Sequence, residues 1–101
     1  MIALTSDTHD AALQAAETVV FDFSSPGCAP CRKVPDLMRQ VIEELSPKEI
    51  RGFEIDVTRS PELAARYMVF SVPTLIVFHK GIETARFHAL PSKAKLRSAL
   101  E

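Results

Sequence analysis

Both cysteines of the chain lie in one stretch, residues 19–31, which reads Val19-Val20-Phe21-Asp22-Phe23-Ser24-Ser25-Pro26-Gly27-Cys28-Ala29-Pro30-Cys31. The first five residues form a nearly continuous apolar run, which is typical of a buried central strand. The next four have the composition of a turn. The cysteines follow at once with C-x-x-C spacing. This stretch therefore places a close pair of thiols directly after a buried strand.

The residues after the cysteines predict an amphipathic helix from about Ala29 to Leu45. Apolar side chains recur there at helical spacing, at Val34, Leu37, Met38, Val41, Ile42 and Leu45. Pro35 lacks a backbone donor and is expected to kink this helix near its first turns. Cys28 therefore lies near the start of a helix, where unpaired N–H groups and the positive end of the helix dipole favour an anion.

This placement suits reversible dithiol chemistry. A thiolate at Cys28 is the form that attacks a disulfide. Cys31 lies one helical turn further on, close enough to attack Cys28 afterwards. The alternative is a pair of structural or inert thiols, although a bridge across so short a loop would stabilise the fold little.

A metal site is a second alternative. Zinc takes four ligands, and the chain offers two cysteines together with His9, His79 and His88, which have no ligand-like spacing. Two chains could also pool their cysteines around zinc or an iron–sulfur cluster. The proline inside the C-x-x-C motif fits a redox site better, so we expect no bound metal.

The bulk properties of the chain exclude several classes of function. A length of 101 residues suffices for a single domain over residues 1–101, and a net charge of −1 without a basic stripe argues against nucleic-acid binding. No apolar run approaches the about 20 residues of a membrane helix. The first residues lack the basic and apolar regions of a secretory signal. We therefore expect a monomeric cytoplasmic protein that binds neither nucleic acid nor membranes.

The rest of the chain predicts alternating strands and helices. Strands are expected at residues 2–4, 18–23, 53–57, 74–79 and 83–88, the last two joined by the tight turn Lys80-Gly81. Further helices are expected from a cap at Ser6 or Asp7 to about Ala16, from Ser60-Pro61 to about Tyr67, and after Pro91-Ser92. The order β-α-β-α-β-α-β-β-α predicts an α/β fold with a central mixed sheet, its last two strands antiparallel, and helices on both faces.

In these features the chain resembles the thioredoxin family over nearly its whole length. The matching residues are Asp22 six positions before Cys28, the Cys28-Ala29-Pro30-Cys31 motif, and Val72-Pro73-Thr74 at the start of an apolar strand. The resemblance implies a thioredoxin-like fold and a cis proline at Pro73. It also implies that the backbone beside Pro73 pairs with an extended substrate chain. The surface that binds substrate would comprise Gly27, Ala29, Pro30, Val72, Pro73 and His88.

The chain also departs from the family pattern. Relatives usually carry tryptophan where this chain has Ser24 and Gly27, and the chain contains no tryptophan at all. A lysine that often faces the buried aspartate corresponds to Gly52. A glycine that flanks the active-site surface corresponds to His88, in an alignment that passes a one-residue gap. These departures concern the partner-binding surface more than the redox motif.

Asp22 requires a reason to lie in an apolar strand, because an unpaired buried carboxylate costs several kcal/mol. Burial would raise its pKa and suit it to take a proton from Cys31 through water. The alternative is that Asp22 faces solvent at the end of a strand or caps the next turn. For His88, a cationic side chain near the dithiol would stabilise a thiolate at Cys28, whereas the alternative is a solvated strand end.

The resemblance and the residues together predict a thiol–disulfide oxidoreductase that reduces protein disulfides. Cys28 would attack, Cys31 would resolve the mixed disulfide and Asp22 would serve as the proton acceptor. The expected enzyme binds no cofactor and receives electrons from a thioredoxin-reductase-type donor. The alternatives are a glutaredoxin-like or oxidising enzyme of the same fold, and a redox-inactive binding module.

Overall fold

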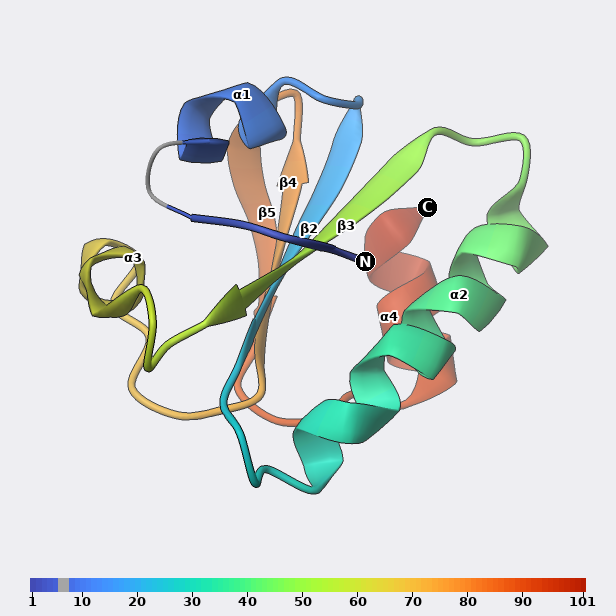
Figure 1. The fold of residues 1–101 in the computed structure, drawn as a ribbon. Coiled ribbons are helices and arrows are strands. Elements are labelled where there is room, and N and C mark those ends of the chain that lie inside the picture. Colours follow the sequence, from blue (N-terminus) through green and yellow to red (C-terminus); the bar gives the residue numbers. More distant parts are fainter. Residues whose placement is uncertain (6–7) are drawn as a thin grey trace.

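A computed structural model describes residues 1–5 and 8–101. Its five strands form one sheet in the order β1-β3-β2-β4-β5 (Figure 1). The strands are β1 (Ile2–Ala3), β2 (Thr18–Ser24), β3 (Ile50–Asp56), β4 (Thr74–His79) and β5 (Ile82–Phe87). Strands β1, β3 and β2 run parallel, whereas β4 and β5 join antiparallel. The predicted mixed sheet is confirmed.

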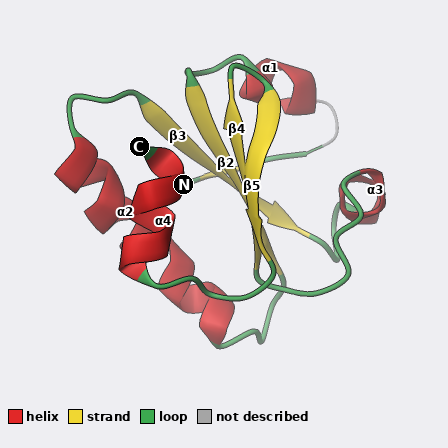
Figure 2. Ribbon diagram, turned by 180° about the vertical axis from the view of Figure 1, so that it is seen from behind, coloured by secondary structure: helices red, strands yellow, loops and turns green. Residues whose placement is uncertain are grey.

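The helices cover both faces of the sheet, as predicted. Figure 2 shows α2 (Val34–Leu45) and α4 (Lys93–Leu100) on one face, and α1 (His9–Leu13) and α3 (Pro61–Arg66) on the other. A separate apolar core lies on each side, because alternate residues of β2 point to opposite faces. Val19, Phe21 and Phe23 belong to the core on the side of α1 and α3, and Val20 to the core under α2 and α4.

Tyr67 completes the first of these cores. Its ring packs at 5.7 Å from that of Phe21 and at 5.9 Å from that of Phe78. Its hydroxyl is hydrogen-bonded to the buried His9. These contacts attach α1 and the end of α3 to the same face of the sheet.

Two helix boundaries differ from the sequence prediction. Helix α1 ends at Leu13 instead of Ala16, since the next two N–H groups bond three residues back, as in a turn. The segment predicted as one helix over 29–45 begins as a 3₁₀ turn, η2 (Pro30–Lys33), and becomes α-helical only at Val34. Pro35 has no N–H to donate to Cys31, so the regular α-helical ladder cannot extend back through it. The proposed cap at Ser6 or Asp7 lies outside the described residues.

The hairpin of β4 and β5 turns at Lys80-Gly81, as predicted. Both residues have positive φ, 52° and 81°, which is the conformation of a type I′ turn. Glycine adopts it without strain.

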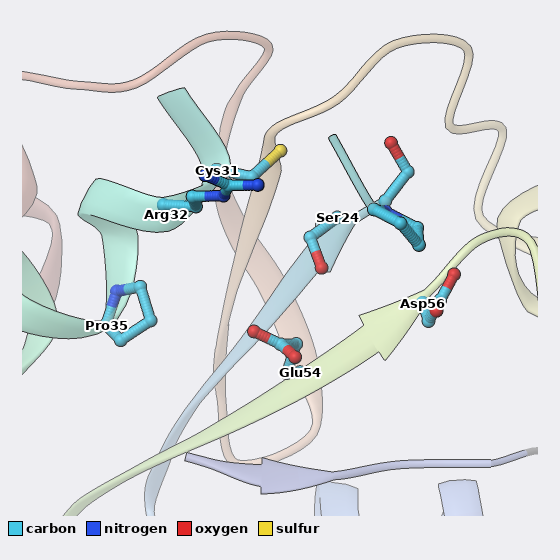
Figure 3. Close-up of a pocket in the computed structure, with 8 residues that line it drawn as sticks. Ser24, Cys31, Arg32, Pro35, Glu54 and Asp56 are labelled. Atoms are coloured by element: carbon cyan, nitrogen blue, oxygen red, sulfur yellow. The ribbon is translucent and has the colours of Figure 1, made fainter. Parts of the chain in front are cut away.

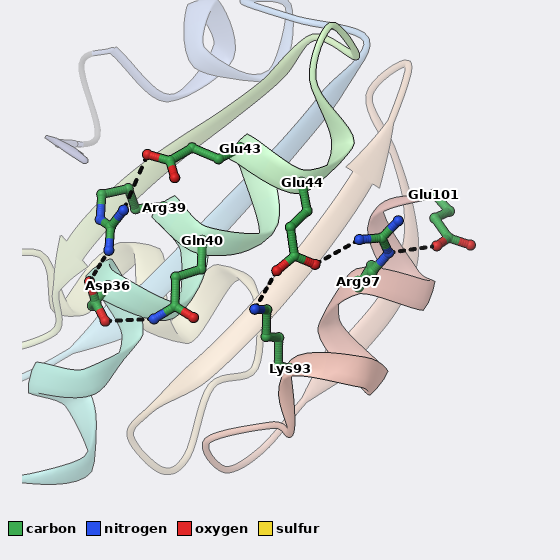
Figure 4. Close-up of polar contacts among 8 residues, drawn as sticks. All are labelled: Asp36, Arg39, Gln40, Glu43, Glu44, Lys93, Arg97 and Glu101. Atoms are coloured by element: carbon green, nitrogen blue, oxygen red, sulfur yellow. Dashed lines mark hydrogen bonds and ion pairs between the residues drawn. The ribbon is translucent and has the colours of Figure 1, made fainter.

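A polar network joins α2 to α4 on the outer surface. Figure 4 shows the Glu44 carboxylate between Lys93 and Arg97, and Arg97 also contacts Glu101. On the same helix as Glu44, Asp36 accepts from Arg39 and Gln40.

Within the described ranges, no helix has the length and hydropathy needed to cross a bilayer.

Candidate active site

Cys28 and Cys31 form a disulfide just beyond the end of β2, with their Cα atoms 5.3 Å apart. Cys28 is half-buried, whereas Cys31, which belongs to η2, is only 5% exposed. The backbone N–H of Cys31 donates to the Cys28 sulfur at 3.2 Å. An incoming group therefore reaches the sulfur of Cys28 more readily than that of Cys31.

The turn that carries Cys28 depends on Gly27. Its φ of +79° lies in the left-handed region, which strains any residue with a side chain. The N–H of Cys28 closes the turn on the carbonyl of Ser25 at 3.4 Å. Ala29 and Pro30 follow as exposed residues. This part of the predicted substrate surface is thus open to solvent.

The Val72–Pro73 peptide bond is cis, as the resemblance implied. Thr74 follows it and pairs with Phe23 of β2. The loop before β4 and the loop that carries the cysteines therefore lie at the same end of these two strands. The Thr74 hydroxyl donates to the Ser71 carbonyl at 2.7 Å. Val72 is half-buried and Pro73 buried.

Asp22 points into the interior between the sheet and α2. It is 0% exposed, and within the described part of the chain neither of its carboxylate oxygens has a hydrogen-bond partner. Burial, and after it the negative charge of Glu54, raise the pKa of Asp22 from 3.8 to about 7. The burial expected for Asp22 is confirmed, and the group can exchange a proton near neutral pH.

A pocket of about 420 Å³ opens beside the buried sulfur. It is lined by Ser24, Ser25, Pro26, Cys31, Arg32, Pro35, Glu54 and Asp56. Figure 3 shows the carboxylate of Glu54 between Ser24 and Pro35, with Asp56 further along β3. Cys31 therefore lines the same pocket as the carboxylates of Glu54 and Asp56, which belong to no sequence motif.

His88 lies apart from this pocket. It is an exposed residue just after β5 and lines a different hollow with Arg86, Phe87, Ala89, Leu90, Pro91, Ser92 and Lys95. That hollow includes neither cysteine. The tuning role of His88 therefore stays a prediction.

Sequence reasoning missed three residues near this edge. Glu54 and Asp56 alternate with the apolar residues of the strand predicted over 53–57, which puts both on one face of that strand but does not relate this face to Asp22. Phe70 is 91% exposed in the loop before the cis proline. An exposed phenylalanine carries no pattern that sequence alone would reveal.

The comparisons with known proteins agree with this geometry. The sequence model of the family described as Thioredoxin matches residues 1–101. The chain belongs to the thioredoxin family. It is 32% identical over 96 residues to a thioredoxin of Chlamydia trachomatis, covering 95% of this chain and 92% of that protein.

Two further similarities define how far the likeness extends. A chloroplastic M-type thioredoxin of Brassica napus is 35% identical over 69 residues, which cover 68% of this chain but only 38% of that protein. A mutant thioredoxin from Halobacterium salinarum superposes with a TM-score of 0.86 at 24% identity, over 98% of this chain and 86% of that one. The thioredoxin fold is therefore established.

Family membership and a C-x-x-C pair at bonding distance support thiol–disulfide oxidoreductase activity. The strand register corrects the position assigned to the family lysine, because Glu54 lies opposite Asp22 whereas Gly52 lies opposite Val20. A Cβ at this glycine would lie 3.0 Å from the side chain of Met1, which occupies the space above it. Among the described residues, no group of three or more His, Cys, Asp or Glu side chains could hold a metal ion.

Proposed function

We propose that the protein reduces protein disulfides through the Cys28–Cys31 pair. The observation that carries this proposal is the unequal burial of the two cysteines: Cys28 is half-buried just before η2, and Cys31 within η2 is 5% exposed. An accessible sulfur followed by a shielded one is the arrangement that attack and resolution require.

The reaction divides into two exchanges. With the pair reduced, the Cys28 thiolate attacks one sulfur of a substrate disulfide; the substrate S–S bond breaks and its other sulfur leaves as a thiolate that takes a proton. The Cys31 thiol then loses its proton and attacks Cys28, which releases the second substrate thiolate and closes the Cys28–Cys31 bond. The substrate disulfide gains two electrons and is reduced, and the Cys28–Cys31 pair loses two electrons and is oxidised.

Asp22 is the proposed acceptor for the Cys31 proton. It lies on the face of β2 toward α2, two residues before Ser24, which lines the same pocket as Cys31. A carboxylate with a pKa of about 7 is half ionised at neutral pH, so it can take up a proton and release it again.

The substrate chain is proposed to lie across Gly27, Ala29 and Pro30 on one side and Val72 and Pro73 on the other. The exposed turn after β2 and the loop before β4 lie at the same end of these two strands. There an extended polypeptide can pair with backbone groups as an added strand does. His88 is proposed to act on this surface through its charge.

Electrons are proposed to come from a thioredoxin-reductase-type donor by further disulfide exchange, without a bound cofactor. We propose a single domain that acts as a monomer in the cytoplasm. These assignments rest on the resemblance to bacterial thioredoxins. The similarity to a chloroplastic thioredoxin makes the chloroplast the alternative compartment.

Insulin reduction under a dithiol reductant, followed as precipitation of the released chains, tests the activity directly. Cys31→Ser should accumulate a mixed disulfide on Cys28, seen as a mass adduct that dithiothreitol removes. Cys28→Ser is the matched control and should form none. A wild-type protein without insulin reductase activity, together with a Cys31→Ser variant that traps nothing, would contradict the proposal and favour a binding module.

A further inference from the structure

Asp22 and Glu54 are neighbours on adjacent parallel strands. Asp22 of β2 lies opposite Glu54 of β3 in the sheet register, and Ser24 lies opposite Asp56. Residues in register on neighbouring strands, about 4.8 Å apart, point to the same face. Both carboxylates therefore face α2, the side on which Cys31 is buried.

The two groups differ in their access to solvent. Asp22 is fully buried and has no hydrogen-bond partner in the described residues. Glu54 is half-buried and its carboxylate lines the pocket beside Cys31 (Figure 3). Glu54 is thus the neighbour of Asp22 in the sheet and also lines the open pocket.

The other charged groups around Asp22 do not occupy this position. The Asp56 carboxylate is bonded to the N–H and hydroxyl of Thr58 at 2.9 and 2.6 Å. Arg32 of η2 lines the pocket but is exposed to solvent. The N-terminal amino group acts on Asp22 through its positive charge, which lowers the pKa of that carboxyl. On the other side β4 places the apolar Leu75 opposite Asp22.

We infer that Glu54 is a positioning residue for the proposed reaction, which acts through Asp22 by passing the proton between Asp22 and solvent. The inference rests on the proposed function. When Cys31 closes the disulfide, its proton goes to the Asp22 carboxylate, then to Glu54 and to water in the pocket. When the disulfide is reduced again, the proton returns along the same route, so no net charge accumulates in the interior.

The electrostatic effect of Glu54 is consistent with this route. Its negative charge is the second cause, after burial, that raises the pKa of Asp22. Removing that charge while keeping the shape of the side chain should therefore change how Asp22 titrates as well as how quickly its proton reaches solvent. A structural role alone would change neither.

Glu54→Gln tests the inference with two measurements. The titration of Asp22, followed by its carboxyl carbon in NMR, should move to lower pH. The rate at which Cys31 resolves a preformed mixed disulfide, measured from pH 5 to 9, should fall several-fold with its midpoint displaced in the same direction, while the KM for insulin stays unchanged. Glu54→Asp keeps the charge and should restore most of the rate.

Glu43→Gln is the matched control, because it makes the same change at an exposed carboxylate of α2 that contacts Arg39 and lies outside this pocket. It should leave both the Asp22 titration and the rate profile as in the wild type. In an Asp22→Asn background, Glu54→Gln should have no additional effect on the rate. Superimposable profiles for Glu54→Gln and the wild type, or an equal displacement by Glu43→Gln, would overturn the inference and leave the proposed function standing. A wild-type protein that reduces no disulfide overturns both.

Discussion

The backbone N–H of Cys31 donates a hydrogen bond to the sulfur of Cys28 at 3.2 Å. We expect this donor to remain in place when the disulfide opens, because it belongs to the backbone of η2. Hydrogen bonds to a charged acceptor are stronger than those to a neutral one. The contact therefore favours the anionic form of Cys28 over that of the shielded Cys31.

The reduced protein should accordingly react with alkylating agents at one cysteine first. At neutral pH, iodoacetamide is expected to modify Cys28 at least ten times faster than Cys31, since the second sulfur is buried. Peptide mass spectrometry at successive times measures both rates. In urea the two rates should become similar, and equal rates in the folded protein would contradict the assignment of Cys28 as the attacking group.

Asp22→Asn should stabilise the oxidised protein in a manner that depends on pH. The folded pKa of about 7 lies above the ordinary 3.8, so the native state binds more protons between these values. The free energy of unfolding of the wild type therefore falls as pH rises from about 4 to about 7 and stays low above that. The variant should gain up to ~4 kcal/mol at pH 8 and almost nothing at pH 3.

Urea unfolding at several pH values measures this gain. Asp56→Asn provides a control of opposite sign, since hydrogen bonds from Thr58 lower the pKa of Asp56. That carboxylate stabilises the native state above its ordinary pKa, so its removal should cost stability at neutral pH and little in acid. A gain for Asp22→Asn that is the same at every pH would show that charge burial is not its cause.

Met68→Gly should stabilise the loop that leads from α3 to the cis proline. Met68 has a φ of 54°, in the left-handed region, and its side chain is largely exposed. Arg86 holds this conformation by donating to the carbonyl of Tyr67 at 2.6 Å. Relief of the steric cost should add about 1 kcal/mol in urea unfolding. Met68→Ala retains a Cβ and should not be stabilised; equal stability of the two variants would refute the strain argument.

His88→Ala tests whether a cation tunes the dithiol. If His88 favours the thiolate of Cys28, its loss should make the protein a weaker oxidant. Equilibration with glutathione measures the potential. His79→Ala, at the Thr18 end of the sheet, is the control. An unchanged potential would leave His88 with no redox role.

Local patterns in the sequence predicted most of the fold. The apolar run at residues 19–23, the Lys80-Gly81 turn and the Pro61 helix start each depend on neighbouring residues, and each lies where it was expected. The end of α1 and the 3₁₀ turn after Cys28 were wrong in detail, because terminal turns are decided by a few competing backbone bonds.

The sequence predicted the site residues that belong to a motif or interrupt an apolar pattern. Cys28, Cys31 and Pro73 belong to motifs, and Asp22 is conspicuous as a charge in an apolar strand. The pairing of Asp22 with Glu54 depends on the register of two strands separated by a whole helix, which no local pattern specifies. The pocket next to Cys31 follows from that register and could be found only in three dimensions.

The packing of Tyr67 has a practical consequence for following this molecule in solution. The chain contains one tyrosine and no tryptophan, so its tyrosine emission comes from a single ring. That ring lies among the aromatic residues on the α1 and α3 side of the sheet, across the strands from the α2 side on which Cys31 is buried. Tyrosine emission can therefore serve as a folding signal in both redox states, and a tryptophan introduced near the cysteines would add a separate optical reporter of the disulfide.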